Sequence, residues 1–303
     1  RSECTHCDCA SALIGLHESF QHTLNVSNLG PTLTSFKSFK NTYKRQYENF
    51  DEYLERFNIF RKNLDTIEEL KRKEKGTAKY GITQFADLTR KFLSCNSRHL
   101  LLMLQGSCFS CWAFSTTGNI EGLLARKTGN LVTLSEQELV DCDSKNHGCM
   151  GGYMTDAVRE LADNLGGLVA ADDYPYLEDD SICILNRSQI IAEVKDVMVF
   201  SKKEENIAKW MYKVGPLSAG INARHLQWYL GGIMHPSKED CSPSKLNHGV
   251  LIVGYGIQSK YPVPEGSIPY WTIKNSWGTE WGEKVNFDCF QFLFDQFTYK
   301  FQK

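Results

Sequence analysis

The sequence has no long apolar run, no excess of charge of one sign, and no repeat or low-complexity tract. Its longest run of large apolar side chains is LLLML at 100–104, far shorter than the roughly 20 residues that a membrane-spanning helix needs. Lys and Arg number 34 against 36 for Asp and Glu, which gives a net charge of −2. This near balance gives no electrostatic reason to expect nucleic acid or an anionic membrane as the main partner. We therefore expect no membrane span and no nucleic-acid partner.

What the chain does contain is a globular composition and many cysteines. Its 303 residues, 42% hydrophobic and 23% charged, suffice for one large domain or two ordinary ones. Eleven cysteines favour disulfides and an oxidising compartment, and the odd number leaves at least one thiol outside any disulfide formed within the chain. The chain begins at Arg1 without a signal-peptide pattern, so we expect that an N-terminal piece has been removed or lies outside this sequence.

The first 90 residues divide into two parts. Residues 1–34 are polar and cysteine-dense, at Cys4, Cys7 and Cys9. Their spacing lacks the second ligand pair of a metal site, which leaves disulfides or a fragment of an upstream domain. The following residues carry an apolar stripe at three- and four-residue steps, which predicts an amphipathic helix ended by the basic run KRKEKG at 71–76. The stripe comprises Tyr53, Phe57, Phe60, Leu64, Ile67 and Leu70.

From residue 105 onward the sequence is typical of a compact enzyme, with helices first and strands later. Helices are predicted at 112–125, 135–140 and 156–165, and strands at 217–221, 250–255 and 270–274. A helical half followed by a strand-rich half predicts an α+β fold of two lobes with a cleft between them.

One cysteine lies in a setting suited to nucleophilic catalysis. Cys111 begins a predicted helix, where exposed backbone N–H groups stabilise a thiolate. Gln105, just upstream, can direct an amide donor at an oxyanion beside that sulfur. A thiolate also needs a base and a group that orients the base. His248 and Asn275 lie 137 and 164 residues after Cys111, close to the separations described for the papain and cathepsin group.

On these residues, and on a series of motifs in the same order, the chain resembles the precursors of papain-like cysteine proteases. The resemblance covers most of 41–88 and 105–283, and it implies the papain-like two-lobed fold, a helical lobe plus a β-barrel-like lobe. The further matching motifs are LSEQELVDC at 134–142, GCMGG at 148–152, GYG at 254–256 and YWTIKNSWG at 270–278.

The resemblance assigns the amphipathic helix to an inhibitory propeptide. The family's helical signature matches at five positions, with Lys71 in place of its last Asn or Gln: Glu52, Arg56, Phe60, Asn63 and Ile67. The second propeptide motif matches at Gly81, Thr83, Phe85 and Asp87. By this analogy the chain's own propeptide is an intramolecular inhibitor that blocks the cleft until low pH loosens its carboxylate contacts.

Roles carry over residue by residue. Cys111 is expected to be the nucleophile, and His248 to hold and deliver the proton. Asn275 is expected to orient the imidazole, and Trp277 to shield that hydrogen bond. Gln105 and the Cys111 N–H are expected to form the oxyanion hole.

Substrate contacts and disulfides are implied in the same way. Gly151 and Gly152 are expected to leave room for an extended peptide to pair with the enzyme backbone. The pocket for the side chain two residues before the scissile bond is expected to prefer a bulky apolar residue, and its lining comprises Tyr153, Met154, Gly220, Leu246 and Gly249. The implied disulfides are Cys108–Cys149 and Cys142–Cys183.

The chain departs from the family pattern at three places. Phe109 replaces a glycine, so its ring is expected to obstruct the cleft. Residues 91–104 match nothing where the family's mature N-terminus lies. The tail, 284–303, lacks the expected strand and the partner of Cys241, although Cys289 is a candidate partner, so we expect an incomplete β lobe.

The sequence thus predicts a cysteine endopeptidase zymogen. Its expected parts are a Cys-rich remnant of a cystatin-like region at 1–34, the propeptide at 35–90, an unmatched junction at 91–104, the peptidase domain at 105–283 and an unmatched tail at 284–303. We expect a lysosomal or secreted monomer without metal or organic cofactor, with peptide or protein substrates and cystatin-type inhibitors as partners. The alternative is an impaired homologue that binds peptides or proteases without cleaving them.

Overall fold

The computed structural model describes residues 29–89, 108–199, 204–237, 243–258, 267–290 and 295–300. The chain forms two compact units, residues 1–63 and 64–303, which are described separately. No helix in the described part of the chain is long and apolar enough to cross a membrane.

The first unit is held together by aromatic side chains. It contains α2 (Leu29–Thr42) and the first half of α3 (Phe50–Lys73). Phe36 of α2 is fully buried, and its ring lies 5.1–5.4 Å from the rings of Tyr53, Phe57 and Phe60 of α3. The Lys40 ammonium lies 4.9 Å from the centroid of the Tyr53 ring, a cation–π distance. These contacts confirm the apolar stripe as the buried face of a helix.

In the second unit, the end of α3 packs against the strand-rich lobe. Ile67 and Leu70 form one apolar cluster with Tyr80 and Trp228. The short strand β1 (Lys79–Tyr80) pairs antiparallel with β6 (Tyr229–Gly231). The last turn of α3 carries Lys71, Arg72 and Lys73, where the helix dipole favours cations.

The helical lobe is built around α4 (Cys111–Thr128), most of whose residues are buried. The helices α5 (Glu136–Cys142) and α6 (Met154–Glu160) pack against α4, and α6 continues into a π-helical turn at Leu161–Leu165. Ser135 caps α5 by accepting a hydrogen bond from the Glu138 N–H (2.9 Å), as the Ser-x-x-Glu pattern predicts. The lobe also holds the strand pair β2 (Gly167–Leu168) and β3 (Ala192–Glu193), and short 3₁₀ turns at Gly148–Met150 and Arg187–Gln189.

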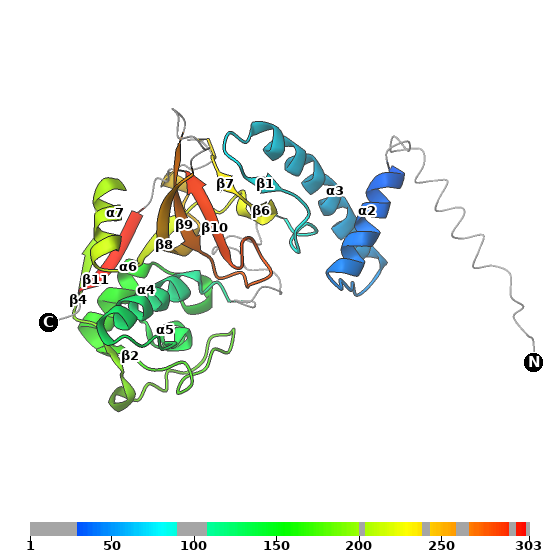
Figure 1. The fold of residues 1–303 in the computed structure, drawn as a ribbon. Helices are drawn as coiled ribbons and strands as arrows, with labels where there is room; N and C mark the ends of the chain where they lie inside the picture. The colour runs from blue at the N-terminus through cyan, green and yellow to red at the C-terminus, as the bar shows by residue number, and fades with distance from the viewer. Residues whose placement is uncertain are drawn as a thin grey trace, which may run out of the picture. The chain divides into compact units, whose positions relative to one another are not determined.

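The second lobe is a seven-stranded sheet in the order β4-β11-β5-β8-β9-β10-β7 (Figure 1). The helix α7 (Glu204–Lys213) adds Ile207 and Met211 to its apolar core, and the 3₁₀ turns Leu226–Trp228 and Pro243–Lys245 lie in its connections. The strands are β4 (Asp196–Val199), β5 (Leu217–Ile221), β7 (Ile233–Met234), β8 (His248–Gln258), β9 (Ile268–Lys274), β10 (Asn286–Phe290) and β11 (Asp295–Lys300).

The tail supplies two of these strands, where the sequence analysis expected an incomplete β lobe. In β10 the side chains of Phe287 and Cys289 are fully buried, and the alternating residues Asn286, Asp288 and Phe290 are partly exposed. This alternation fits a strand with one face on a core. β10 lies between β9 and β7, and β11 lies between β4 and β5. Among the described strands no pairing joins β4 to β7, so the sheet is not a closed barrel.

Candidate active site

Cys111 is the first residue of α4, an 18-residue helix that starts after Ser110. The Cys111 side chain is buried, and its sulfur accepts a hydrogen bond from the Gly249 N–H at 3.3 Å. The N–H groups of the first helical turn, together with this donor from the other lobe, favour negative charge on the sulfur. The start of α4 therefore provides the environment that a reactive thiolate requires.

The antiparallel pairing of β8 with β9 brings His248 and Asn275 together. His248 begins β8 and Asn275 directly follows β9, so a register in which Leu251 faces Lys274 places these strand ends side by side. The His248 Nε2 and the Asn275 Oδ1 lie 2.7 Å apart. The same Oδ1 accepts from the Ser276 N–H at 2.8 Å, which fixes the amide orientation.

Aromatic rings cover this pair. The Trp277 ring lies 5.2 Å from the His248 ring, and the Phe85 ring packs edge-on against Trp277 at 5.5 Å. His248, Asn275 and Trp277 are all buried. Exclusion of water strengthens the hydrogen bond between His248 and Asn275.

Burial lowers the pKa of His248 to about 4, and the hydrogen bond with Asn275 opposes this shift. Cys111 is disulfide-bonded in the structure, so its sulfur carries no charge that would stabilise an imidazolium. The other described cysteines form the two disulfides below or, at Cys289, keep a thiol, so the partner of Cys111 is not among the described residues. Reduction of Cys111 is therefore required before an ion pair with His248 can form.

The glycine pair lies on a loop beside the helix that carries Cys111. Gly151 has φ 109°, a conformation that favours glycine. A Cβ on Gly152 would lie 2.5 Å from the Asn146 side chain and 2.8 Å from the Trp112 ring, so the chain approaches both too closely for any other residue. Tyr153, which follows, is exposed.

The structure also brings together four of the residues predicted to line the apolar side-chain pocket. Gly220 pairs with Gly249 across β5 and β8, and a Cβ on Gly220 would lie 3.4 Å from Leu246. A Cβ on Gly249 would lie 3.1 Å from the Met154 sulfur. Tyr153 is adjacent to Met154 in the chain.

The remaining expectations concern the oxyanion-hole residue Gln105, the ring of Phe109 and the cysteine partner of Cys241. Gln105 lies outside the described residues, as do the junction at 91–104 and Cys241. Phe109 is described: its N–H donates to the Cys149 carbonyl at 3.1 Å, and its side chain is half-buried. Cys289 keeps a buried thiol and is therefore not the partner of Cys241 in this structure.

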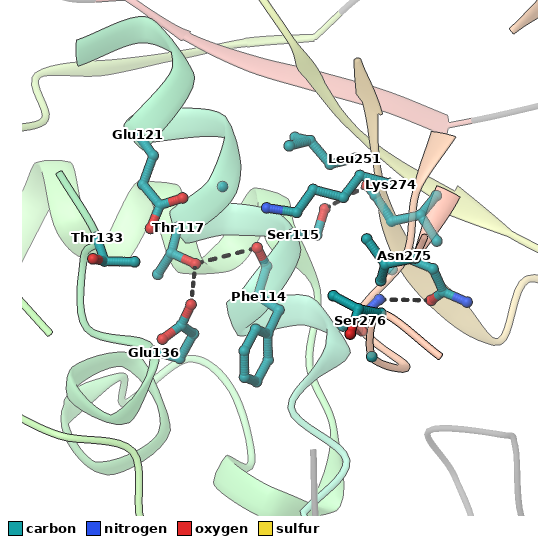
Figure 2. Close-up of a pocket in the computed structure, with 16 residues that line it drawn as sticks. Phe114, Ser115, Thr117, Glu121, Thr133, Glu136, Leu251, Lys274, Asn275 and Ser276 are labelled. Atoms are coloured by element: carbon teal, nitrogen blue, oxygen red, sulfur yellow. Dashed lines mark hydrogen bonds between the residues drawn. The ribbon is translucent and has the colours of Figure 1, made fainter. Parts of the chain in front are cut away.

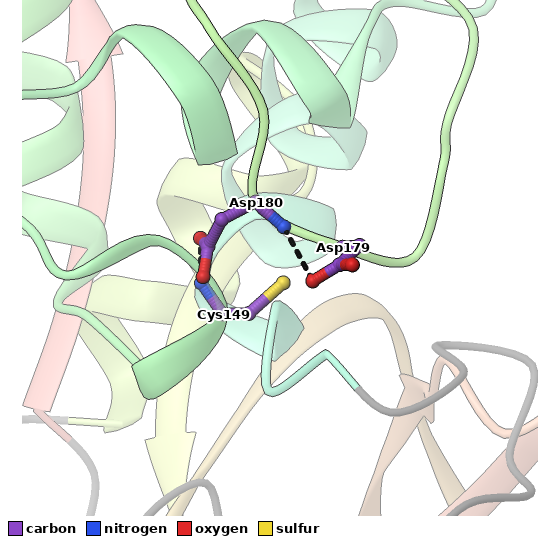
Figure 3. A group of neighbouring side chains, drawn as sticks. All are labelled: Cys149, Asp179 and Asp180. Carbon is purple, nitrogen blue, oxygen red and sulfur yellow. Dashed lines mark hydrogen bonds between the residues drawn. The ribbon is translucent and has the colours of Figure 1, made fainter.

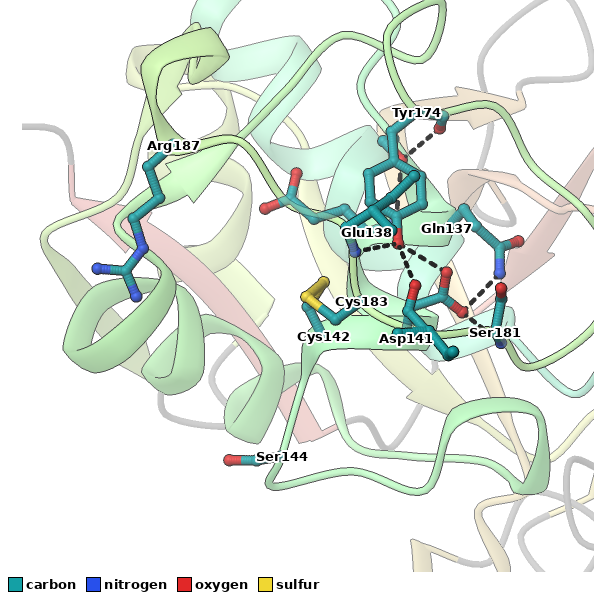
Figure 4. Close-up of a disulfide and its surroundings, with 12 residues drawn as sticks. Gln137, Glu138, Asp141, Cys142, Ser144, Tyr174, Ser181, Cys183 and Arg187 are labelled. Atoms are coloured by element: carbon teal, nitrogen blue, oxygen red, sulfur yellow. Dashed lines mark hydrogen bonds between the residues drawn. A yellow bond between two sulfur atoms is a disulfide. The ribbon is translucent and has the colours of Figure 1, made fainter.

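Both implied disulfides are present, Cys108–Cys149 and Cys142–Cys183. Beside the second, Asp141 accepts hydrogen bonds from Gln137 Nε2, the Tyr174 hydroxyl and the Ser181 N–H, each at 2.8 Å (Figure 4). This disulfide and Asp141 tie the 174–183 segment to α5.

Cys149, Asp179 and Asp180 cluster closely enough to suggest metal ligands (Figure 3). The Cys149 sulfur is committed to its disulfide with Cys108, however. Asp180 accepts from the Cys149 N–H at 2.7 Å, and Asp179 accepts from the Asp180 N–H at 2.9 Å. The cluster is thus explained as a hydrogen-bonded loop.

A pocket of about 350 Å³ opens between α4 and the strands β8 and β9 (Figure 2). Glu121 and Glu136 line one wall, and Lys274 extends from the other. Burial raises the pKa of Glu136 to about 7 and also raises the pKa of Glu121. These residues carry no motif of their own, and the sequence does not indicate them because burial of a glutamate is not visible in it.

The segment that follows α3 is bound to the 227–235 region by backbone hydrogen bonds. The N–H groups of Thr77 and Ala78 both donate to the Ile233 carbonyl, at 2.9 and 3.0 Å. The Gly81 N–H donates to the Trp228 carbonyl at 2.9 Å. The expected propeptide motif, which starts at Gly81, thus directly follows a strand added to β6.

Gln227 holds the rest of that motif. Its Nε2 donates to the carbonyls of Phe85 and Leu88, both at 2.7 Å, and its own carbonyl accepts from the Thr83 hydroxyl. Gln227 is fully buried. The 83–88 segment is therefore fixed next to Trp277 and the His248–Asn275 pair.

Comparison with known proteins agrees with this fold. The model of the papain family of cysteine proteases matches residues 100–291, and that of the cathepsin propeptide inhibitor domain matches residues 36–91. The chain belongs to the papain family of cysteine proteases and carries the cathepsin propeptide inhibitor domain. The predicted papain-like α+β fold is confirmed.

Among named relatives, the chain is similar to cathepsin F. It is 41% identical over 285 residues to cathepsin F of Drosophila melanogaster and 38% identical over 282 residues to that of Mus musculus, with 82% of this chain covered in each case. The chain spans only 46% and 59% of the length of these two relatives. Cysteine proteinase 15A of Pisum sativum is 38% identical over 87% of this chain and 82% of its own length.

Solved structures of proforms share the fold. The digestive procathepsin L 3 of the Tenebrio molitor larval midgut superposes with a TM-score of 0.74 and 29% identity, over 89% of this chain and 99% of that chain. The proform of Amb a 11, a ragweed pollen cysteine protease, superposes with a TM-score of 0.76 and 26% identity, over 91% of this chain and 94% of that chain.

Proposed function

We propose that the chain is the zymogen of a cathepsin F-like cysteine endopeptidase. The observation that carries this proposal is the arrangement of three residues from three elements. The Cys111 sulfur contacts the Gly249 N–H at 3.3 Å, and the Nε2 of the preceding residue, His248, lies 2.7 Å from the Asn275 Oδ1. A nucleophile, a base and a base-orienting amide therefore lie together at the interface of the two lobes.

The reaction follows from this arrangement. The reduced Cys111 thiolate attacks the carbonyl carbon of a peptide bond, and Gln105 with the Cys111 N–H stabilises the oxyanion. The carbon–nitrogen bond then breaks, the His248 imidazolium gives its proton to the leaving amine, and a thioester remains on Cys111. Water, deprotonated by His248, hydrolyses the thioester and restores the thiol. The step needs no metal or organic cofactor.

Substrate choice is proposed from the pocket lined by Met154, Gly220, Leu246 and Gly249. Because its side chains are apolar, a bulky apolar residue two positions before the scissile bond is preferred. Peptides and proteins are the substrates, and cystatin-type proteins are the inhibitors.

This proposal includes a division of the chain into five parts. They are a remnant at 1–34, a propeptide at 35–90, a junction at 91–104, a peptidase domain at 105–283 and a tail at 284–303. It also includes a lysosomal or secreted location and a monomeric state. The propeptide contacts at 77–88 support intramolecular inhibition. The alternative of a homologue that only binds peptides is not favoured by the comparisons.

The test is covalent labelling of Cys111 by a peptide epoxide, read by mass spectrometry, with peptide hydrolysis measured in parallel. The purified chain is first reduced mildly and brought to acidic pH. We expect labelling and hydrolysis in the wild type, loss of hydrolysis in Cys111→Ala, and loss of both in His248→Ala. Undiminished hydrolysis by Cys111→Ala would refute the proposal, and so would a folded, processed wild type that is neither labelled nor active.

A further inference from the structure

Among the side chains that hold the loop of Gly151 and Gly152 is that of Asn146, whose exposed fraction is 8%. The Asn146 Oδ1 accepts from the Tyr153 N–H at 2.7 Å, and its Nδ2 donates to the Tyr153 carbonyl at 3.3 Å. Both backbone groups of Tyr153 are thus bonded by a single amide, in the way that a neighbouring β-strand would bond them.

The two hydrogen bonds between Asn146 and Tyr153 determine the direction in which the N–H and carbonyl of Gly152 point. Tyr153 is extended (φ −119°, ψ 130°), and in extended chain the backbone groups of successive residues point to opposite sides. Since those of Tyr153 point inward to Asn146, those of Gly152 point away from it. Within the described residues, no hydrogen bond engages the Gly152 N–H or carbonyl. They are therefore available to a ligand that lies along the loop.

The orientation of the Asn146 amide is itself determined. Its Nδ2 also donates to Asp143 Oδ2 at 2.6 Å, and Asp143 Oδ1 accepts from the N–H groups of Lys145 and Asn146, at 2.8 and 3.1 Å. The Tyr153 N–H needs an acceptor and the Asp143 carboxylate needs a donor, so only one amide orientation satisfies both. A flipped or shortened side chain would break these bonds.

Asn146 is also packed against the helix of the nucleophile. The Cβ position of Gly152 lies between the Asn146 amide and the Trp112 ring, and Trp112 Nε1 donates to the Gly148 carbonyl at 3.2 Å. Trp112 follows Cys111 directly in α4. The distance from the Gly152 backbone to the nucleophile is therefore set by the same contacts.

We propose that Asn146 is a positioning residue for peptide recognition: it takes the place of a β-strand neighbour on the inner side of Tyr153 and so presents the Gly152 N–H and carbonyl to a peptide substrate. This inference rests on the proposed peptidase function. Asn146 does not touch the reacting atoms. Its removal weakens binding of a peptide that extends along Gly152, and it leaves the reactivity of the Cys111 thiolate unchanged.

The experiment compares three reagents on the mildly reduced full chain: a blocked tripeptidyl chloromethyl ketone, a blocked single-residue chloromethyl ketone and iodoacetamide. The first extends along Gly152, the second is too short to do so, and the third reports the thiolate alone. The second-order rate of Cys111 alkylation is measured for each, and each peptide reagent is expressed as a ratio to iodoacetamide. The propeptide covers the cleft equally in every variant, so its effect on these rate ratios cancels when variants are compared.

The variants are Asn146→Ala and the isosteric Asn146→Asp, which leaves no cavity but cannot donate to Asp143. The matched control is Asn164→Ala, which removes an exposed amide bonded to Glu160 Oε2 at 2.7 Å. We expect the tripeptide ratio to fall about tenfold in both Asn146 variants, because a tenfold change corresponds to the loss of one or two hydrogen bonds. The single-residue ratio should stay within twofold, and Asn164→Ala should change neither ratio.

An unchanged tripeptide ratio in Asn146→Ala overturns the inference, and so does an equal fall for the single-residue reagent, which would indicate general distortion of the site. Failure of iodoacetamide to alkylate Cys111 in the reduced wild type has a different meaning. It refutes the proposed thiolate function, and the inference falls with it.

Discussion

At the scale of single residues, the ionisation of His248 depends on the state of Cys111. With the sulfur in a disulfide, burial holds the pKa of His248 to about 4, and the ring is neutral above that pH. A thiolate at Cys111 places a negative charge beside the ring and raises that pKa, because an opposite charge favours the charged form. Reduction therefore creates both members of the ion pair together.

Phe109, two residues before Cys111, carries the first prediction. The Phe109 side chain is half-buried at a position where the resemblance implies glycine, and the Phe109 N–H donates to the Cys149 carbonyl. We expect Phe109→Gly to raise kcat/KM for peptide substrates several-fold, because the cleft next to the nucleophile becomes open. Phe109→Ala, which removes the ring without adding backbone freedom, should show most of the gain. Equal or lower kcat/KM in both variants would show that the ring does not obstruct the substrate.

The residues proposed to be catalytic could be predicted because they lie in motifs. Cys111, His248 and Asn275 each lie in a run of residues whose order is specific, and the fold brings those runs together. Glu121, Glu136 and Asn146 escaped prediction because their roles depend on burial and on contacts with distant backbone. Gly152 and Asn146 are six residues apart in an irregular loop, and no periodicity indicates their contact.

At the scale of elements, the join between α3 and β1 depends on one carboxylate. Glu74 Oε1 accepts from the N–H groups of Gly76 and His235, at 2.6 and 2.8 Å, and its Oε2 accepts from the Tyr80 hydroxyl at 2.6 Å. Through Glu74 the end of the propeptide helix, the start of β1 and the segment after β7 are held together. Hydrogen bonds to a charged acceptor are the stronger kind.

We expect Glu74→Ala to release the propeptide more readily. Loss of these bonds should speed cleavage of the 74–89 segment by an added protease about tenfold, a change of about 1.4 kcal/mol in the opening equilibrium. The measurement is the half-time of cleavage on gels, made in a Cys111→Ala background so that self-processing plays no part.

The control for this prediction is Glu68→Ala, which removes an exposed carboxylate of α3 that pairs with Lys71 at 2.7 Å. It should leave the half-time unchanged. A Glu74→Ala chain that is cleaved at the wild-type rate would show that the backbone ladder alone holds the segment.

The helices and strands themselves followed from periodicity, with ends that shifted by a few residues. The predicted helix at 156–165 is split, since α6 ends at Glu160 and a π-helical turn follows. The strands β10 and β11 were missed because the tail matched no family motif, although the buried Phe287 and Cys289 alternate as a strand requires.

At the scale of the whole molecule, buried glutamates tie stability to acidity. Glu138 is fully buried, and burial raises its pKa from the ordinary 4.5 to about 7. Its Oε2 accepts from the Val169 N–H at 2.8 Å, and its Oε1 has no hydrogen-bond partner among the described residues. Because the folded state raises this pKa, Glu138 contributes its stability below pH 4.5 and loses it as the pH rises through 7. The loss is on the order of 3 kcal/mol.

We therefore expect Glu138→Gln to flatten the dependence of the unfolding free energy on pH between 4.5 and 7.5. The wild type should lose stability relative to this variant as the pH rises, because only the wild type must ionise a buried carboxyl. The raised pKa of Glu136 also lowers stability as the pH rises, and the lowered pKa of His248 has the opposite effect. Both effects are present in the wild type and in the variant, so they cancel when the two are compared. The measurement is urea unfolding followed by tryptophan fluorescence.

The matched control is Glu193→Gln, an exposed glutamate paired with Lys195 at 3.1 Å. Its pH profile should parallel that of the wild type. A Glu138→Gln profile that also parallels the wild type would mean that Glu138 stays ionised when folded.

The order of the strands in the sheet has a consequence for synthesis. β4 and β5 leave the ribosome well before β11, yet β11 lies between them. Until those late residues emerge, β4 has no partner in the seven-stranded sheet, and β5 pairs only with β8. A nascent chain thus carries unpaired strand edges, which other chains can join. Protection by chaperones is needed most in that interval, and a ribosome that stalls shortly before β11 would release a product prone to aggregate.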